Sequence, residues 1–186
     1  MQSTKTPFDT LLSWKIEEVE RYACNAATNG DIETLSYCLA ALSPKHKSGT
    51  LTAWLNVTEF AQTLGLYPVI WLQRASEITG LFTPQTTGKH HLYIILLSGL
   101  RGKTPGYGLY VGETSKKPEA RFREHAQGKR SKKGPLFSRI VHKHHKCLLP
   151  TLYDHLNPLS REEAKELESK IAEALRLEAI PVYGGH

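Results

Sequence analysis

The chain has 186 residues, of which 40% are hydrophobic and 23% charged, as is usual for a globular protein with a buried core. Its net charge of +6 at pH 7 favours an anionic partner. The sequence contains no apolar stretch with the length of a membrane-spanning helix or the pattern of a signal peptide, and its three cysteines form neither a zinc motif nor a disulfide framework. We therefore expect no membrane partner and a reducing, cytoplasmic setting.

Two helices are predicted in the N-terminal part. From Phe8 to Asn25, and again from Ile32 to Leu42, apolar residues recur every three or four positions and polar residues fill the intervals. The Asn-Gly-Asp sequence at Asn29–Asp31 ends the first helix and supplies an N-cap for the second.

Residues 57–80 have the spacing of a helix-turn-helix. Thr58 is predicted to cap a short helix, Gly65 to supply the turn, and Pro68 to open a second helix. That second helix would begin with the apolar run Val69–Leu72, whereas a helix that reads DNA needs polar groups facing a groove. Two interpretations stay open, a DNA-reading helix-turn-helix and a helical hairpin that packs on the main domain.

A polar linker, Thr83–His90, separates a helical region, residues 1–88, from a second domain, residues 89–186. Two strands rich in aromatic and β-branched residues follow the linker at His91–Gly99 and Tyr107–Gly112, with a hairpin connection between them. The second domain is therefore expected to begin with a β-hairpin.

Helices and one further strand are predicted after the hairpin. The helices are Pro118–Gly128, Leu136–His144 and Asn157–Ile180, the last with a capping box formed by Ser160 and Glu163. A third strand is expected within Cys147–Leu156, where Pro150 suggests the edge of a sheet. We therefore expect an α+β fold: a small, mainly antiparallel three-stranded sheet flanked by helices, preceded by the N-terminal helical region.

Positive charge is concentrated between Arg101 and Lys146, where thirteen Lys and Arg stand against three acidic residues. A basic segment that also carries helix and strand signals favours a nucleic-acid-binding surface, although Lys-rich loops are often only solvated. The side chains expected to contact a phosphate backbone are Lys116, Lys117, Arg123, Lys129, Arg130, Lys132, Lys133, Arg139 and Lys143.

Residues suited to acid–base chemistry recur around the predicted hairpin. Each strand brings a tyrosine, Tyr93 and Tyr110, and Gly112 ends the second strand. The following helix carries Arg121 and His125 at i, i+4 spacing, which places both side chains on one helix face. The last helix brings several carboxylates.

This order of residues resembles the GIY-YIG nuclease family over Leu92 to the C-terminus. The first family motif would be Leu92–Ile94, with leucine where the family has glycine, and the second is Tyr110–Gly112. The family's arginine falls on Arg121 and its histidine on His125. Its metal-binding glutamate falls within the sequence LESKI, which nominates Glu168.

The resemblance implies a divalent-metal-dependent DNA endonuclease that hydrolyses phosphodiester bonds. Glu168 would hold Mg²⁺, with Mn²⁺ as a substitute, because Mg²⁺ keeps several waters and needs few protein ligands. Arg121 would donate hydrogen bonds to phosphate oxygens. Tyr93 or Tyr110 would act as general base or orient the attacking water, and Gly112 would let the strand end turn sharply beside the substrate. The histidine, His125, would accept a proton, relay one from a tyrosine, or position a phosphate.

The C-terminal tail departs from the family pattern, because Gly184 stands where the family usually has an asparagine that binds within the site. The leading function is an endonuclease of restriction, mobile-element or repair type. A nucleic-acid-binding module with this fold and weak or no catalysis is the alternative, and a basic domain that meets an acidic protein is a third. DNA is the expected partner, RNA is not excluded, and a homodimer would suit a palindromic target.

The sequence VHKHHK at Val141–Lys146 raises a separate metal hypothesis. His142 and His145 would lie at i, i+3 spacing on a helix, but apart from Cys147 no cysteine or carboxylate lies at ligand spacing. A basic helix end that faces the substrate is the favoured interpretation over a zinc site.

Overall fold

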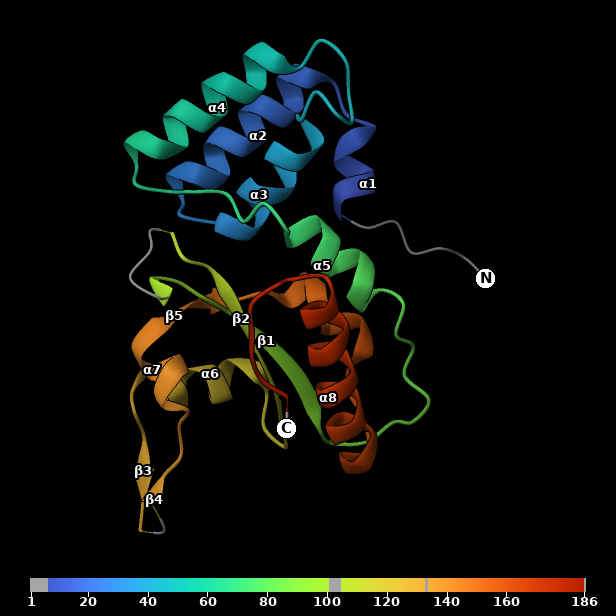
Figure 1. The fold of residues 1–186 in the computed structure, drawn as a ribbon, viewed down its shortest axis with the longest axis vertical. Coiled ribbons are helices and arrows are strands. Elements are labelled where there is room, and N and C mark those ends of the chain that lie inside the picture. The colour runs from blue at the N-terminus through green and yellow to red at the C-terminus, as the bar shows by residue number, and fades with distance from the viewer. Residues whose placement is uncertain (1–6, 101–104, 133, 186) are drawn as a thin grey trace. The chain divides into compact units, whose positions relative to one another are not determined.

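The structure is a computed structural model that describes residues 7–100, 105–132 and 134–185. The chain forms two compact units that divide between Ser76 and Glu77. The first is helical and the second carries a sheet flanked by helices, so the predicted α+β fold with an N-terminal helical region is confirmed (Figure 1).

The first unit is built from α-helices. They are α1 (Pro7–Leu12), α2 (Ile16–Thr28), α3 (Ile32–Ala41), α4 (Leu51–Thr63) and the first part of α5 (Leu72–Thr79). The structure has two helices, α1 and α2, where a single helix was predicted from Phe8 to Asn25, because the helical conformation is interrupted between Leu12 and Ile16. There Lys15 acts as N-cap, and its backbone N–H donates to the Glu18 carboxylate at 3.1 Å. The small and branched side chains Ala23, Leu35 and Val57 are fully buried and form the core.

The region with helix-turn-helix spacing differs from its prediction in two details. Thr58 does not cap a helix, because α4 already begins at Leu51 and the Thr58 hydroxyl donates to a carbonyl one turn earlier at 2.7 Å. Pro68 does not open the next helix, which starts at Leu72. Residues 64–71 between the helices make a connection longer than the three- or four-residue turn of a helix-turn-helix.

The main sheet of the second unit has four strands in the order β5-β1-β2-β6. The strands are β1 (His91–Leu97), β2 (Gly108–Thr114), β5 (His145–Leu148) and β6 (Val182–Gly184). β1 pairs antiparallel with β2 and β5, and β6 adds a parallel pairing to β2. The predicted hairpin and the predicted edge strand are present, although the edge strand ends before Pro150. The fourth strand, β6, was not predicted.

β1 is the centre of the unit. Its residues Leu92–Leu97 are all buried, on both faces of the sheet, which explains why this strand is a continuous apolar run rather than an alternating one. The flanking helices are α6 (Pro118–Ala126), α7 (Arg139–His144) and α8 (Arg161–Leu177). Short 3₁₀ turns at Pro150–Leu152 and Asp154–Leu156, and the small hairpin of β3 (Arg130–Ser131) and β4 (Gly134–Pro135), complete the unit.

The polar linker is part of the second unit, which explains why this unit begins at Glu77 rather than at the predicted residue 89. The backbone N–H groups of Gln85 and Thr86 donate to the Glu163 carboxylate at 2.6 and 2.8 Å. Ser160 accepts the Glu163 N–H at 3.2 Å, as in a capping box, but the Glu163 carboxylate binds the linker instead of completing the box. Within the described residues, no helix is long and apolar enough to cross a membrane.

Candidate active site

The two tyrosines of the hairpin lie side by side. The register of β1 and β2 places Tyr93 opposite Gly112 and Tyr110 opposite Ile95, so both tyrosines project from one face of the sheet. Their ring centroids are 6.1 Å apart.

Gly112 is inside β2, which continues to Thr114, so its predicted role at a sharp turn is wrong. A Cβ at Gly112 would lie only 2.6 Å from the Tyr93 hydroxyl oxygen and 2.9 Å from the Tyr110 ring. Glycine is therefore required at this position because two aromatic side chains cross it.

His125 is completely buried, and its environment fixes which ring nitrogen carries the proton. The backbone N–H of Ser138 donates to His125 Nδ1 at 2.9 Å. The proton of the neutral ring must then be on Nε2, which lies 3.0 Å from the Tyr93 oxygen and donates to it. Burial, followed by the nearby Arg121 charge, lowers the pKa of His125 to about 4. His125 is thus a neutral hydrogen-bond donor. The predicted role as proton acceptor would need a free ring nitrogen, and the predicted contact with a phosphate would need an exposed side chain. His125 has neither.

Arg121 reaches the same tyrosine from the same helix. It hydrogen-bonds Tyr93, and its Nη1 donates to the Leu136 carbonyl at 2.6 Å and lies 3.4 Å from the Glu124 carboxylate. The i, i+4 spacing of Arg121 and His125 therefore brings two donors to one phenol oxygen. The Arg121 side chain keeps 24% of its surface exposed, which leaves part of the guanidinium available to an anion.

The two tyrosines differ in access and in ionisation. Tyr93 is 1% exposed, whereas Tyr110 is half-buried. Burial raises the pKa of both phenols. For Tyr110, the hydrogen bond with Tyr93 and, less strongly, the charge of Arg121 and the hydrogen bond with Ser138 offset part of this rise, but the Glu168 carboxylate adds to it, and the pKa stays above its ordinary value. Tyr110 is therefore the phenol that a bound water or phosphate can reach, and its neighbours Tyr93 and Arg121 offset part of the cost of ionising it.

A groove of about 560 Å³ opens at this place, and Tyr110, Arg121, Ser138 and Gly184 are among the residues that line it. Its size admits the sugar-phosphate segment of a nucleic-acid strand. Arg121 supplies the positive charge of the lining and Tyr110 its acid–base group.

Glu168 lies on α8, half-buried, and close enough to Tyr110 to raise the pKa of that phenol. Within the described residues, no group of three or more His, Cys, Asp or Glu side chains is arranged to hold a metal ion, so neither the VHKHHK segment nor the groove contains a full protein cage. The donor set fits a hydrated Mg²⁺ bound through one carboxylate, the mode in which Mg²⁺ keeps most of its waters.

The tail explains why no asparagine occupies position 184. Gly184 pairs with Val111 in the parallel β2–β6 ladder and has a φ of +80°. A Cβ there would lie 2.4 Å from the Val111 carbonyl oxygen. Arg176 of α8 donates to the Gly184 carbonyl at 2.5 Å, so strand pairing and this side-chain hydrogen bond together hold the tail.

All of the predicted phosphate-contacting residues that the structure describes are exposed, and Lys133 lies outside the described residues. Two of them, Lys116 and Lys129, contact the buried carboxylate of Glu124 at 2.5 and 3.2 Å. Sequence analysis missed Glu124 and the backbone of Ser138 as parts of the site. The signal for Glu124 was an acid next to His125 and one turn after Arg121 on the same helix.

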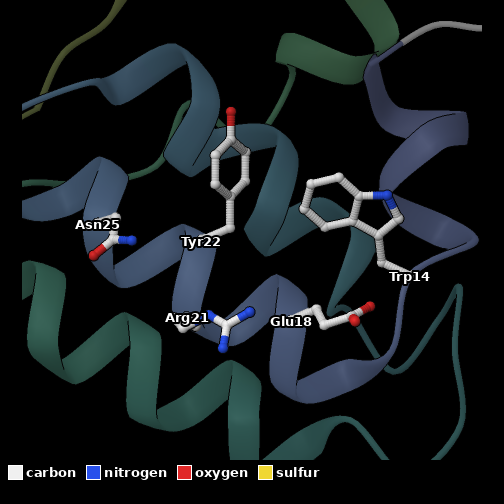
Figure 2. A pocket seen from close by; sticks show the side chains of 5 residues that line it. All are labelled: Trp14, Glu18, Arg21, Tyr22 and Asn25. Atoms are coloured by element: carbon white, nitrogen blue, oxygen red, sulfur yellow. The ribbon is translucent and has the colours of Figure 1, made fainter.

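A groove of about 450 Å³ in the first unit has a different character (Figure 2). The rings of Trp14 and Tyr22 lie with centroids 5.4 Å apart, and Glu18, Arg21 and Asn25 stand beside them. One acidic and one basic side chain give this lining no net charge, and none of the predicted site residues belongs to it.

Comparisons of this chain with protein-family models, with curated proteins and with solved structures give no match. The candidate site therefore stands on the residues and contacts described above.

Proposed function

We propose that the second unit is a divalent-metal-dependent DNA endonuclease of GIY-YIG type, which hydrolyses phosphodiester bonds in restriction, a mobile element or repair. The observation that carries this proposal is the convergence of Arg121 and His125 on Tyr93, beside the accessible Tyr110. The basic character of the unit supports a nucleic-acid substrate: residues 77–186 contain eighteen Lys and Arg against eleven Asp and Glu.

In this mechanism Arg121 contacts a phosphate oxygen and stabilises the charge that develops on it. As the phenolate, Tyr110 orients the attacking water and accepts its proton, while a bond forms from the water oxygen to phosphorus and the bond to the leaving oxygen breaks; the leaving oxygen then takes a proton from solvent. Tyr93 donates to Tyr110 and receives hydrogen bonds from His125 and Arg121. These buried donors act through Tyr93 to stabilise the Tyr110 phenolate.

Glu168 would hold the divalent ion, Mg²⁺ or Mn²⁺. Such an ion neutralises phosphate charge and assists the leaving oxygen when it is bound. Without the ion, burial and the Glu168 carboxylate both disfavour ionisation of Tyr110.

The test is incubation of the purified protein with supercoiled plasmid, linear duplex, single-stranded and branched DNA, each with Mg²⁺ and with Mn²⁺. We expect cleavage by the parent, none by Glu168→Ala with binding retained, and parental activity for Glu173→Ala, an exposed control on the same helix. Absence of cleavage on every substrate would remove the enzyme proposal.

A finer test separates the two tyrosines under single-turnover conditions. Tyr110→Phe should lower the cleavage rate by about 10²-fold or more, the range for loss of a general base. Tyr93→Phe should lower it by only about tenfold, because Tyr93 is buried and acts through its neighbour. Equal losses, or a larger loss for Tyr93→Phe, would contradict the assignment of Tyr110 as the base.

The second candidate function is a nucleic-acid-binding module with weak or no catalysis, on DNA or RNA. It is favoured by Gly184, whose backbone leaves no room for the family's asparagine. It predicts tight, salt-sensitive binding by the parent and by Glu168→Ala alike, without cleavage. A cytoplasmic setting and a homodimer, which would match a palindromic target, complete the proposal.

A further inference from the structure

A second groove, of about 490 Å³, adjoins the first at Arg121. Its lining includes Lys116, Glu124 and Arg161, together with Thr114 at the end of β2. Arg121 lines both grooves, so a strand that reaches the tyrosines on one side has a continuation on the other.

The acidic side chains of this second groove are already engaged. Glu113 pairs with His90 at 2.8 Å. Glu124 accepts from Lys116 at 2.5 Å and lies 3.4 Å from Arg121. The Glu124 carboxylate faces cations within the protein, so it does not oppose an incoming anion with its full charge, and the Glu113 carboxylate is held in its contact with His90.

Glu124 is 6% exposed and gathers three cations, Lys116, Arg121 and Lys129, around one carboxylate. Its pKa is lowered to about 2, chiefly by the hydrogen bond from Lys116, so it stays ionised at every ordinary pH. Three positive charges around one negative charge leave an excess of two. The buried carboxylate fixes their positions before any ligand arrives, which is the arrangement of a preorganised anion site.

Two further features complete the groove. The Thr114 hydroxyl accepts the Lys116 backbone N–H at 3.1 Å and so fixes the turn that presents Lys116. Arg161, the first residue of α8, is exposed, and among the described residues it makes no ion pair. Because it is exposed and lines the groove, its guanidinium can reach a ligand bound there.

We propose that the second groove binds a phosphodiester of the same nucleic-acid strand, next to the one at the tyrosines. Lys116 and Arg161 contact this phosphate, and Glu124 is a positioning residue that holds Lys116 and Arg121. The inference rests on the proposed function in one respect only, that the ligand is a nucleic acid.

The test is binding of a fluorescent DNA duplex, measured by anisotropy between about 50 and 300 mM salt, in the Glu168→Ala background so that no cleavage intervenes. The variants are Arg161→Ala, Lys116→Ala and their combination. Lys170→Ala is the matched control, because Lys170 lies two and a half turns further along α8 on the opposite face. Far-ultraviolet circular dichroism checks that each variant folds, and Arg161→Gln replaces Arg161→Ala if the latter does not.

We expect each single variant to weaken binding by about fivefold or more near 100 mM salt. The slope of log K against log salt should become shallower by about 0.9 for each phosphate contact removed. In the cleaving protein, the same variants should raise KM and leave kcat within about twofold, because the groove binds substrate without touching the reacting atoms. The control should change neither quantity.

Affinity and slope that stay at the Lys170→Ala values would overturn the inference, whether or not the parent cleaves DNA. If the parent binds DNA without cutting it and the variants lose affinity, the groove stands and the nuclease proposal falls. A parent that binds no nucleic acid at low salt would contradict both.

Discussion

At the scale of single residues, the site depends on a histidine whose chemistry is set by one backbone N–H. Ser138 occupies His125 Nδ1, so the ring presents an N–H rather than a lone pair to Tyr93. A histidine with the opposite proton position would accept from the phenol and weaken its support of Tyr110. The segment that contains Ser138 also supplies the Leu136 carbonyl that holds Arg121, so one short stretch of backbone orients both side chains.

The first prediction concerns pH and His125. The folded-state pKa of about 4 lies below the ordinary value of 6.5, so at acidic pH the unfolded chain binds a proton that the folded chain does not. The stability from this difference is complete above pH 6.5 and is lost as the pH falls towards 4. A shift of about 2.5 units corresponds to about 3 kcal/mol.

The measurement is urea unfolding of the parent and of His125→Asn at pH 7.5, 5.5 and 4.5. The variant should be less stable than the parent at pH 7.5, and the gap should narrow as the pH falls. A difference in stability that is constant over this range would show that the pKa of His125 is the same in the folded and the unfolded protein.

At the scale of elements, the hairpin of β1 and β2 and the helix α6 could be predicted because local signals determine them. Aromatic and β-branched residues favour the strands, and Pro118 opens α6 by fixing its first turn. The contacts of Glu124 and Ser138 could not be predicted, because they join residues that only the folded backbone brings together. β6 was missed because a segment of three residues that ends in glycine is too short for a strand signal, although Val182 and Tyr183 favour strands. Its pairing with β2 forms only after α8 returns the chain to the sheet.

The second prediction follows from β6. Gly184→Asn restores the residue that the resembled family usually has, but a Cβ there meets the Val111 carbonyl at 2.4 Å, and φ is +80°. We therefore expect the substitution to lower the melting temperature by about 5 °C or more and not to increase cleavage. Val182→Thr, a half-buried position on the same strand, serves as control. Higher cleavage by Gly184→Asn without loss of stability would contradict this steric argument, because it would show that the fold has room for an asparagine at position 184.

At the scale of the whole molecule, the two units differ in net charge. Residues 1–76 contain six Lys and Arg against seven Asp and Glu, whereas residues 77–186 carry an excess of seven positive charges. The predicted site residues also lie in the second unit alone. The residues and the positive charge that carry the proposed nuclease function therefore belong to the second unit.

The last prediction uses the boundary between the units. A fragment of residues 77–186 should fold cooperatively, bind DNA with the salt dependence of the full chain, and keep its cleavage rate per molecule within about tenfold. A fragment of residues 89–186, cut at the boundary that the sequence suggests, lacks the bonds of Gln85 and Thr86 to Glu163 and that of Thr79 to His155. At about 1 kcal/mol for each net hydrogen bond, we expect its melting temperature to be lower by about 12 °C or more.

Thermal unfolding followed by circular dichroism compares the two fragments, and cleavage of the same plasmid compares their activity. Equal melting temperatures would show that the linker does not stabilise the second unit. Loss of DNA binding by both folded fragments would instead place the nucleic-acid surface in the first unit, against the charge distribution that assigns it to the second.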